Sequence, residues 1–452
     1  MKNNVNILTG PITKGLITMS IPIMIMNVAQ SLFNIIDMTI LGQFVDDSSV
    51  GAVGASGMLI TLFTVLLIGI SSGTNVVIAK HLGGKNITKA EDAIGTALIF
   101  SVISSAILAV VGFIFSEPLL RLTNCPETLL PQARLYCRIY FCGVPFIMLY
   151  NFCANIIRST GDSKRPMSYL LIAGALKVVL NYCFIVFFKT TVSGVAYATI
   201  ISMAVACVFA LNTIFNKMTE FNMTIKKIKF SFAELKSILY IGVPAGLQSA
   251  LYSLANVVIS STVNKYGEYA TTGISIANQF DNILYQICTA SSFAVMPFVA
   301  QNVGAKNFTR VKQIVSKAVL ITTAIGATFG SLSAIFSGQL SSLMTDNPEV
   351  VKYSQEKMII ISSTYFICGI NEIFCASLRG LGKPIISTIA TFIFMCLFRF
   401  IWVYVFFPLC PNFTFLYAVW PIGWISSIIT LLCFYFPTLK KLISLKSKES
   451  IK

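Results

Sequence analysis

Twelve apolar runs, each long enough to cross a membrane, follow one another along the chain. A run of about 20 apolar residues spans the hydrocarbon core of a bilayer as an α-helix. The alternating pattern of porin strands is not seen, so helices must satisfy the backbone in lipid. We predict an all-α integral membrane protein with spans over 16–44, 52–79, 93–115, 135–157, 167–188, 192–215, 237–263, 272–300, 316–337, 358–379, 385–408 and 414–438.

The composition agrees with this prediction. Hydrophobic residues make up 56% of the 452 residues, charged residues make up 11%, and the mean hydropathy is +0.80. Too few polar residues remain to cover a soluble core of this size. A net charge of +16 would suggest a nucleic-acid partner in a soluble protein, but membrane topology explains it better.

The 33 Lys and Arg residues are unevenly distributed between the two sides of the predicted bundle. With a cytoplasmic N-terminus, most of them fall in cytoplasmic segments, and the few in outer loops include Lys357. The positive-inside rule then predicts a multi-pass cell-membrane protein with both termini in the cytoplasm and no nucleic-acid partner. The start of the chain leads directly into the first run, so we expect no signal peptide. His81, the single histidine, is predicted to be solvated in a cytoplasmic loop.

The chain also repeats itself. Residues 79–88 (Ala-Lys-His-Leu-Gly-Gly-Lys-Asn-Ile-Thr) recur as residues 300–309 (Ala-Gln-Asn-Val-Gly-Ala-Lys-Asn-Phe-Thr), and nearly the same offset relates Pro22 to Pro244. Such a duplication is typical of a transporter with a binding site between two structural repeats. We predict two pseudo-twofold six-helix lobes, residues 1–218 and 237–452, joined by a basic, solvated cytoplasmic linker over 219–236. Pro22 and Pro244 predict either fixed kinks or hinges in the first helix of each lobe.

Ionisable residues within the spans of the first half mark a candidate site, since each costs at least about 2.5–3.5 kcal/mol at mid-membrane. Asp37 shares a helical face with two amides, and Lys177 lies four residues before another amide. The sequence leaves open whether Asp37 and Lys177 form a static neutral pair or a functional site. The polar residues expected at a cavity here are Gln30, Asn34, Asn151, Asn155 and Asn181.

The second half carries a different set of charges. Asn278 and Asp281 share a face of the eighth span, and Glu372 and Arg399 lie in the tenth and eleventh. Glu372 and Arg399 could form a static ion pair. Asp281 has no evident cation in its own span, so we expect it to carry a proton or bind a cation. These five ionisable residues sum to −1, which weakly favours cationic cargo.

In these features the chain resembles the multidrug and toxic compound extrusion (MATE) antiporters along its whole length. The resemblance rests on Ile21-Pro22, the run from Asn34 to Gly42, Gly83-Gly-Lys-Asn86 and its repeat, Arg158-Ser-Thr-Gly161-Asp162, and Leu378-Arg-Gly-Leu-Gly382. It implies two lobes around a V-shaped cavity and export of organic cations or drugs in exchange for H⁺ or Na⁺. It also implies a coupling role for Asp37. Glu372 and Arg399 look like residues of the bacterial DinF- and MepA-like branch.

The chain departs from the family pattern at its fifth span. Many relatives carry an Asn and, four residues later, an Asp, where this chain has Lys177 and Asn181. A lysine there can take the place of a sodium ion beside Asp37, so we favour proton coupling, or coupling through Asp281 and Glu372.

The expected mechanism is alternating access, in which protonation of a carboxylate releases a cationic substrate. Side chains that could form the substrate wall are Phe33, Tyr252, Phe280 and Tyr285. The alternative is a flippase for lipid-linked oligosaccharides or peptidoglycan precursors, whose anionic cargo would need a cationic cavity. We expect no enzymatic activity, no cofactor or metal site and a monomeric protein.

Overall fold

The computed structural model describes residues 5–449 except 124, 219 and 222. Within this part of the chain, twelve helices are long and apolar enough to cross a membrane, one for each predicted run. The prediction of an all-α membrane protein is therefore confirmed. Most helices extend beyond the predicted ends, and the tenth span begins ten residues earlier than its hydropathy suggested, because polar residues at its start belong to the same helix.

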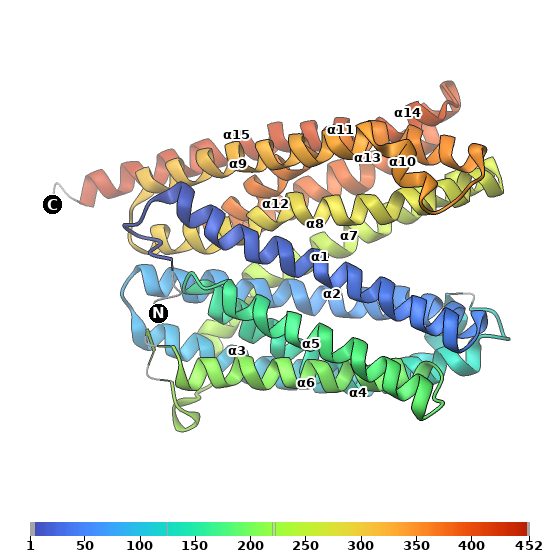
Figure 1. Cartoon of the computed structure of the whole chain (residues 1–452). Helices are drawn as coiled ribbons and strands as arrows, with labels where there is room; N and C mark the ends of the chain where they lie inside the picture. Colours follow the sequence, from blue (N-terminus) through green and yellow to red (C-terminus); the bar gives the residue numbers. More distant parts are fainter. Residues whose placement is uncertain (1–4, 124, 219, 222, 450–452) are drawn as a thin grey trace. The chain divides into compact units, whose positions relative to one another are not determined.

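The helices are named as in Figure 1. In chain order they are α1 (Ile12–Phe44), α2 (Asp47–Gly83), α3 (Ile87–Leu122), α4 (Leu130–Ser159), α5 (Lys164–Tyr182) with η1 (Cys183–Phe187), α6 (Val192–Asn216), η2 (Ile225–Lys227), α7 (Phe232–Val263), η3 (Asn264–Tyr266), α8 (Glu268–Gly304), α9 (Phe308–Ile335), α10 (Ser337–Ser342), α11 (Pro348–Gly380), α12 (Pro384–Thr391), η4 (Phe392–Leu397), α13 (Phe398–Ile401), η5 (Trp402–Phe406), η6 (Phe407–Leu409), α14 (Phe413–Tyr417) and α15 (Val419–Glu449). The elements from α12 to η6 together form the eleventh span.

The contacts divide the chain into two compact units. Unit 1 contains Val28–Gly246, and unit 2 contains Val5–Asn27 together with the chain from Leu247 onward. Helices α1 and α7 therefore each contribute residues to both units. In α1 the division falls five residues after Pro22, and in α7 it falls two residues after Pro244. Within each unit the long helices run side by side (Figure 1).

One helix lies at the centre of each unit. In unit 1, α4 packs against α2, α3 and α6, and in unit 2, α11 packs against α8, α9 and α15. These two helices occupy the same position in the two sequence repeats. Because neighbouring helices surround them, polar side chains on α4 and α11 are shielded from lipid, and α11 carries the buried Lys357 and Glu372.

The repeated turns adopt the same backbone conformation in both units. Lys85 and Lys306 have φ angles of 57° and 54°, and Gly161 and Gly382 have φ angles of 91° and 75°. This left-handed region favours glycine, which explains why both Arg-x-x-Gly segments end in glycine. The duplication in the sequence is thus a duplication of backbone geometry.

Asp162 follows the first of these glycines and organises the start of α5. Its buried carboxylate accepts hydrogen bonds from the backbone N–H groups of Lys164 (3.0 Å) and Arg165 (3.1 Å). Burial raises the pKa of the Asp162 carboxyl, and the hydrogen bonds from these amides oppose the shift. The turn between α4 and α5 is therefore held by a buried acid that acts as a helix cap.

The lysines of the linker between the repeats, Lys226, Lys227 and Lys229, are exposed, whereas other linker residues pack against the protein. The N–H of Ser231 donates to Oγ1 of Thr96 in α3 at 2.9 Å. Phe221 and Met223 are buried. At Gly95 in α3, a Cβ atom would lie 2.7 Å from the carbonyl oxygen of Lys229. The linker can therefore approach α3 closely only because residue 95 has no side chain.

Helices α2 and α7 cross in unit 1 with their backbones in direct contact. Each carries two glycines four residues apart, Gly69 and Gly73 in α2 and Gly242 and Gly246 in α7. A Cβ atom on Gly69 would lie 2.1 Å from Cα of Gly246, and one on Gly73 would lie 2.3 Å from the carbonyl oxygen of Ile238. Paired small residues of this kind allow membrane helices to pack closely. Because Pro244 lies between Gly242 and Gly246, the bend-prone part of α7 is held against α2.

We predict that Gly73→Ala lowers the thermal stability of the purified protein, because its methyl group must displace backbone atoms of α7. The expected loss is about 1–3 kcal/mol, as for other overpacked cores. Gly54→Ala in the same helix is the matched control, since a Cβ atom there meets nothing within 4 Å. Equal melting temperatures for the two variants in detergent would contradict the observed helix crossing.

Candidate functional site

In unit 1, a buried acid on α1 is paired with a lysine on α5. The Asp37 carboxylate forms an ion pair with the Lys177 ammonium and accepts a hydrogen bond from the Asn181 amide. Lys177 and Asn181 are four residues apart and therefore reach Asp37 from one face of α5. The Asp37 and Asn181 side chains are buried, whereas 16% of the Lys177 side chain remains accessible. The neutral pair anticipated from the sequence thus exists in the structure.

The other polar residues expected at this site have different surroundings. Asn155 donates to Oγ of Ser71 in α2 at 2.9 Å, and Asn151 donates to the carbonyl oxygen of Ile147 in its own helix at 2.8 Å. Gln30 and Asn34 lie on α1 with exposed side chains. The structure therefore joins Asn181 to Asp37, but it uses Asn155 in the contact between α2 and α4.

Phe33 packs against the backbone of α5. A Cβ atom on Gly174 would lie 1.9 Å from a ring carbon of Phe33. The Phe33 ring therefore occupies the space that the missing side chain of Gly174 leaves. This contact gives Phe33 a packing role in unit 1.

In unit 2, Asp281 on α8 is paired with Lys357 on α11. The distance from Nζ of Lys357 to Oδ2 of Asp281 is 2.7 Å, and Nζ also donates to Oδ1 of Asn278. Only 3% of Lys357 is exposed. This corrects the expectation that Lys357 lies in an outer loop, and it gives Asp281, which has no cation in its own span, a cation from a neighbouring helix. The lysine belongs to α11 because that helix begins at Pro348, before the predicted start of the span.

Arg399 is the most deeply buried cation near this pair, with 2% of its surface exposed. Its Nη1 donates to Oδ1 of Asn256 on α7 at 2.6 Å, and its guanidinium lies 4.6 Å from the ring centroid of Trp420. Arg399 lies between the π-helical segments η4 and η5. Such irregular turns are frequent at functional sites because they re-aim side chains.

Glu372 and Arg399 take different partners, so the ion pair that the sequence left open does not form between them. Oε1 of Glu372 accepts a hydrogen bond from the Tyr252 hydroxyl at 3.3 Å, while Arg399 is held by Asn256. In the described part of the chain, no cation lies within ion-pairing distance of Glu372. Glu372 is buried, and its charged form is favoured by electrostatic attraction to Arg379 and by the hydrogen bond from Tyr252, without a direct ion pair among the described residues.

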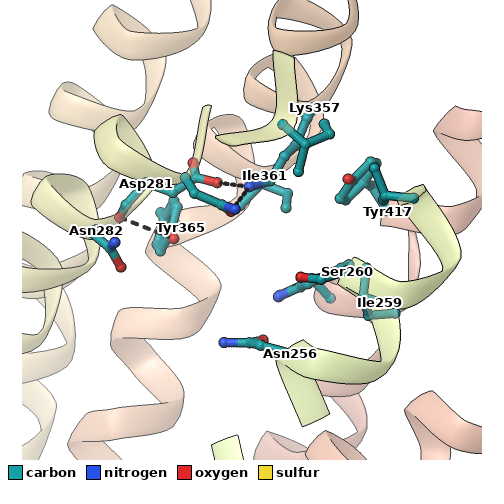
Figure 2. Close-up of a pocket in the computed structure, with 13 residues that line it drawn as sticks. Asn256, Ile259, Ser260, Asp281, Asn282, Lys357, Ile361, Tyr365 and Tyr417 are labelled. Carbon is teal, nitrogen blue, oxygen red and sulfur yellow. Dashed lines mark hydrogen bonds and ion pairs between the residues drawn. The ribbon is translucent and has the colours of Figure 1, made fainter. Parts of the chain in front are cut away.

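A cavity of about 290 Å³ lies beside the Asp281–Lys357 pair (Figure 2). Figure 2 shows Asp281, Asn282 and Lys357 on one wall and Asn256, Ile259 and Ser260 on the facing wall. The complete lining consists of Asn256, Ile259, Ser260, Val263, Ile274, Asn278, Asp281, Asn282, Lys357, Ile361, Tyr365, Tyr417 and Trp420. Polar and aromatic groups converge on this cavity, as in ligand pockets. Of the expected wall residues, Tyr252, Phe280 and Tyr285 are half-buried but are not part of its lining.

Lys357 adds a cation to the five ionisable residues expected within the spans. The six residues Asp37, Asp281, Glu372, Lys177, Lys357 and Arg399 together carry no net charge. The sum of −1 over the five expected residues therefore no longer favours cationic cargo. Cargo charge must instead be inferred from the groups that line each cavity.

His81 is paired, which corrects the expectation that it is solvated. Its Nε2 lies 3.0 Å from Oε2 of Glu234, and the histidine and glutamate side chains are 20% and 11% exposed. The pair links the end of α2 to the start of α7, where the two helices cross within unit 1.

Two residues of the site, Asn256 and Lys357, were not predicted although the sequence contains a signal for each. The repeat offset that relates Pro22 to Pro244 also carries Asn34 onto Asn256, the partner of Arg399. Lys357 was assigned to a loop because hydropathy marks where a helix becomes apolar, not where it begins. A helix start at Pro348, after the capping residue Asn347, was readable from the sequence.

Comparison with known proteins identifies the repeat as a family feature. The family model described as MatE matches the chain twice, over residues 22–183 and again over residues 244–405. The two matches begin at Pro22 and Pro244. Together they cover more than half of the chain, including Asp37, Asp281 and Glu372.

Individual relatives and solved structures agree with this match. The chain is 30% identical to a probable multidrug resistance protein, YoeA, of Bacillus subtilis, over 82% of this chain and 81% of that protein. It is 26% identical to an FAD transporter of Shewanella oneidensis, over 86% and 87% of the two chains. A solved structure described as an outward-facing multidrug resistance MATE transporter superposes with a TM-score of 0.89 at 23% identity, covering 99% of both chains. At this identity the superposition establishes the fold.

We predict that removing either partner of the Asp37–Lys177 pair destabilises unit 1 more than removing both. Asp37→Asn or Lys177→Met leaves an uncompensated buried charge, a change that typically lowers stability by about 3–5 kcal/mol. The double variant leaves no charge and should melt at a temperature closer to that of wild type. The measurement is thermal unfolding in detergent, with Lys164→Met at the exposed start of α5 as the control. Additive losses in the double variant would show that the two side chains are not coupled.

Proposed function

The chain belongs to the MatE family, and from this we propose that it is a secondary transporter that exports small organic molecules and drugs in exchange for protons. The observation that carries this proposal is the presence in each unit of a buried acid held by a lysine, Asp37 by Lys177 and Asp281 by Lys357. Ion pairs placed this deep in membrane helices are rare and mark proton or substrate pathways.

A proton can exchange with each of these pairs. When a carboxylate takes up a proton, it becomes neutral, and its attraction for the neighbouring ammonium or for a bound cationic substrate is lost. The proton later leaves to the opposite side, and the carboxylate binds the cation again. If the two protonation states favour opposite openings of the transporter, uptake of a proton from outside drives release of the substrate.

Glu372 is the acid best suited to carry the proton. Its only hydrogen-bond partner in the described part of the chain is the Tyr252 hydroxyl, a group that can stay in place whether the carboxyl is charged or neutral. Asp37 and Asp281 would by contrast lose an ion pair on protonation. We therefore assign Glu372 as the main proton carrier and the two aspartates as groups that adjust to its state.

Protons are favoured over sodium by the donor sets. Sodium ions need several oxygen ligands, whereas an ammonium group already occupies the cation position at Asp37 and at Asp281. The amide nitrogen of Asn181 also donates a hydrogen bond to Asp37. The partial positive charge of this N–H group would repel a sodium ion at the same carboxylate.

The relatives bear on the cargo and on the alternative of a lipid flippase. Those compared are named for drug resistance or for FAD transport, which supports export of small molecules. The cavity of about 290 Å³ also lies within one unit and is too small for a lipid-linked oligosaccharide.

The proposed location is the plasma membrane, with both termini in the cytoplasm according to the positive-inside bias.

Everted membrane vesicles test the function directly. We expect a pH gradient to drive transport of ethidium, an organic cation, and a sodium gradient at fixed pH to have no effect. Glu372→Gln should reduce proton-driven transport to the level of vesicles that lack the transporter, because a glutamine at this position cannot bind and release a proton.

Asp346→Asn is the matched control for this experiment, since Asp346 is exposed and lies just before α11. It should transport like wild type at equal expression. Sodium-driven transport without a pH gradient, or normal activity of Glu372→Gln, would refute the assignment.

A further inference from the structure

Two asparagines that line the cavity of unit 2 each accept a hydrogen bond from a cation through the amide oxygen. Nζ of Lys357 donates to Oδ1 of Asn278, and Nη1 of Arg399 donates to Oδ1 of Asn256 at 2.6 Å. Lysine and arginine can only donate hydrogen bonds, so each must face an amide oxygen. The orientation of both asparagines is therefore fixed by their cations.

This fixed orientation leaves the amide nitrogens free to face the cavity. Both asparagines line it, and both have exposed side chains. In Figure 2 the nitrogen of Asn256 points into the open space between the two walls. The buried hydroxyl of Tyr417, another lining residue, has no hydrogen-bond partner within the described residues. The cavity thus presents N–H and O–H donors beside an acceptor, Oδ1 of Asp281, that has no partner in the described part of the chain and can itself donate when Asp281 is protonated. With Asp281 neutral, the cavity suits a ligand that accepts hydrogen bonds.

Lys357 adds a charge to these donors. Two of the three N–H bonds of its ammonium are directed to Asp281 and Asn278, and the group also lies 5.8 Å from the ring centroid of Tyr417, which lines the cavity. An anionic ligand would accept the third N–H and compete with Asp281 for the ammonium. When Asp281 is neutral, the ammonium is left without a counterion and its attraction for an anion is largest.

The aromatic residues indicate the rest of the ligand. Tyr417 and Trp420 are stacked with ring centroids 5.3 Å apart, and both line the cavity. The cavity volume of about 290 Å³ is close to the lower end of the ~300–1,000 Å³ typical of ligand pockets, so the ligand must be small.

We propose that this cavity binds the carboxylate of a small aromatic acid through Lys357 and the amides of Asn256 and Asn278. The inference rests on the proposed function in that it takes the ligand to be cargo, and it extends the cargo to drugs that carry an acidic group. The neutral form of Asp281 is the binding form of this cavity, whereas the proton exchanged in the proposed antiport is the separate one carried by Glu372.

Two naphthalene ligands of opposite charge test the proposal on the full-length protein purified in detergent. They are 1-naphthoate and 1-naphthylmethylammonium, with binding measured by calorimetry. Asp281→Asn mimics the neutral acid and should tighten naphthoate binding by about tenfold, because Lys357 is released from its counterion. Adding Lys357→Gln to this variant should remove the gain, whereas adding Lys352→Gln, an exposed lysine in the same helix, should not.

Each outcome bears on the proposal. It is overturned if Asp281→Asn prefers the ammonium ligand, or if naphthoate binds equally well with and without Lys357. Asn256→Asp supplies a second test that leaves the Asp281–Lys357 pair intact. It places a carboxylate on the facing wall and should weaken naphthoate binding, and unchanged binding would also overturn the proposal. Because binding needs no ion gradient, a failure of proton-driven transport in vesicles would leave these results unaffected.

Discussion

The structure depends on the neutralisation of charges inside an apolar bundle. An isolated ionised group costs several kcal/mol in such surroundings, so each one needs a partner of opposite charge or a strong hydrogen bond. The chain supplies them by placing its lysines on α5 and on the central helix α11, and its aspartates on the adjoining α1 and α8. A pair held this way is stable only while both members keep their charge. Any event that neutralises one member changes the bundle around it, which is what a coupled transporter requires.

The two units share a backbone but differ in chemistry. The same left-handed residues recur at Lys85 and Lys306, yet Asp37 corresponds by the repeat to Ile259, and Glu372 corresponds to Asn151. Within unit 1, α2 is held to the first half of α7 by four glycines and by the His81–Glu234 pair. The described cavity between charged and amide groups lies in unit 2. Duplication therefore provided the scaffold, and substitutions in each half provided two different sites.

Much of the fold was predictable, because the length and hydropathy of a membrane helix are local properties of the sequence. The twelve spans and the MATE family were predicted correctly for this reason. The site was less predictable, because partners depend on which helices are neighbours. Lys357 was missed because it lies in the polar first turns of α11. A pair between Arg399 and Glu372 stayed open because both lie in adjacent spans, and no sequence pattern indicated that Asn256 is the partner of Arg399. The contact between Asp37 and Lys177 was foreseen because the family pattern brings those two positions together.

The central claim is that a buried carboxylate gains and loses a proton as the transporter binds its cargo. Infrared difference spectroscopy on reconstituted protein measures this directly, since a protonated carboxyl group has a C=O stretching band separate from that of a carboxylate. The account predicts that such a band changes when cargo is added and that Glu372→Gln removes the change. A difference spectrum without any carboxyl band in the wild-type protein, despite saturating cargo, would contradict it.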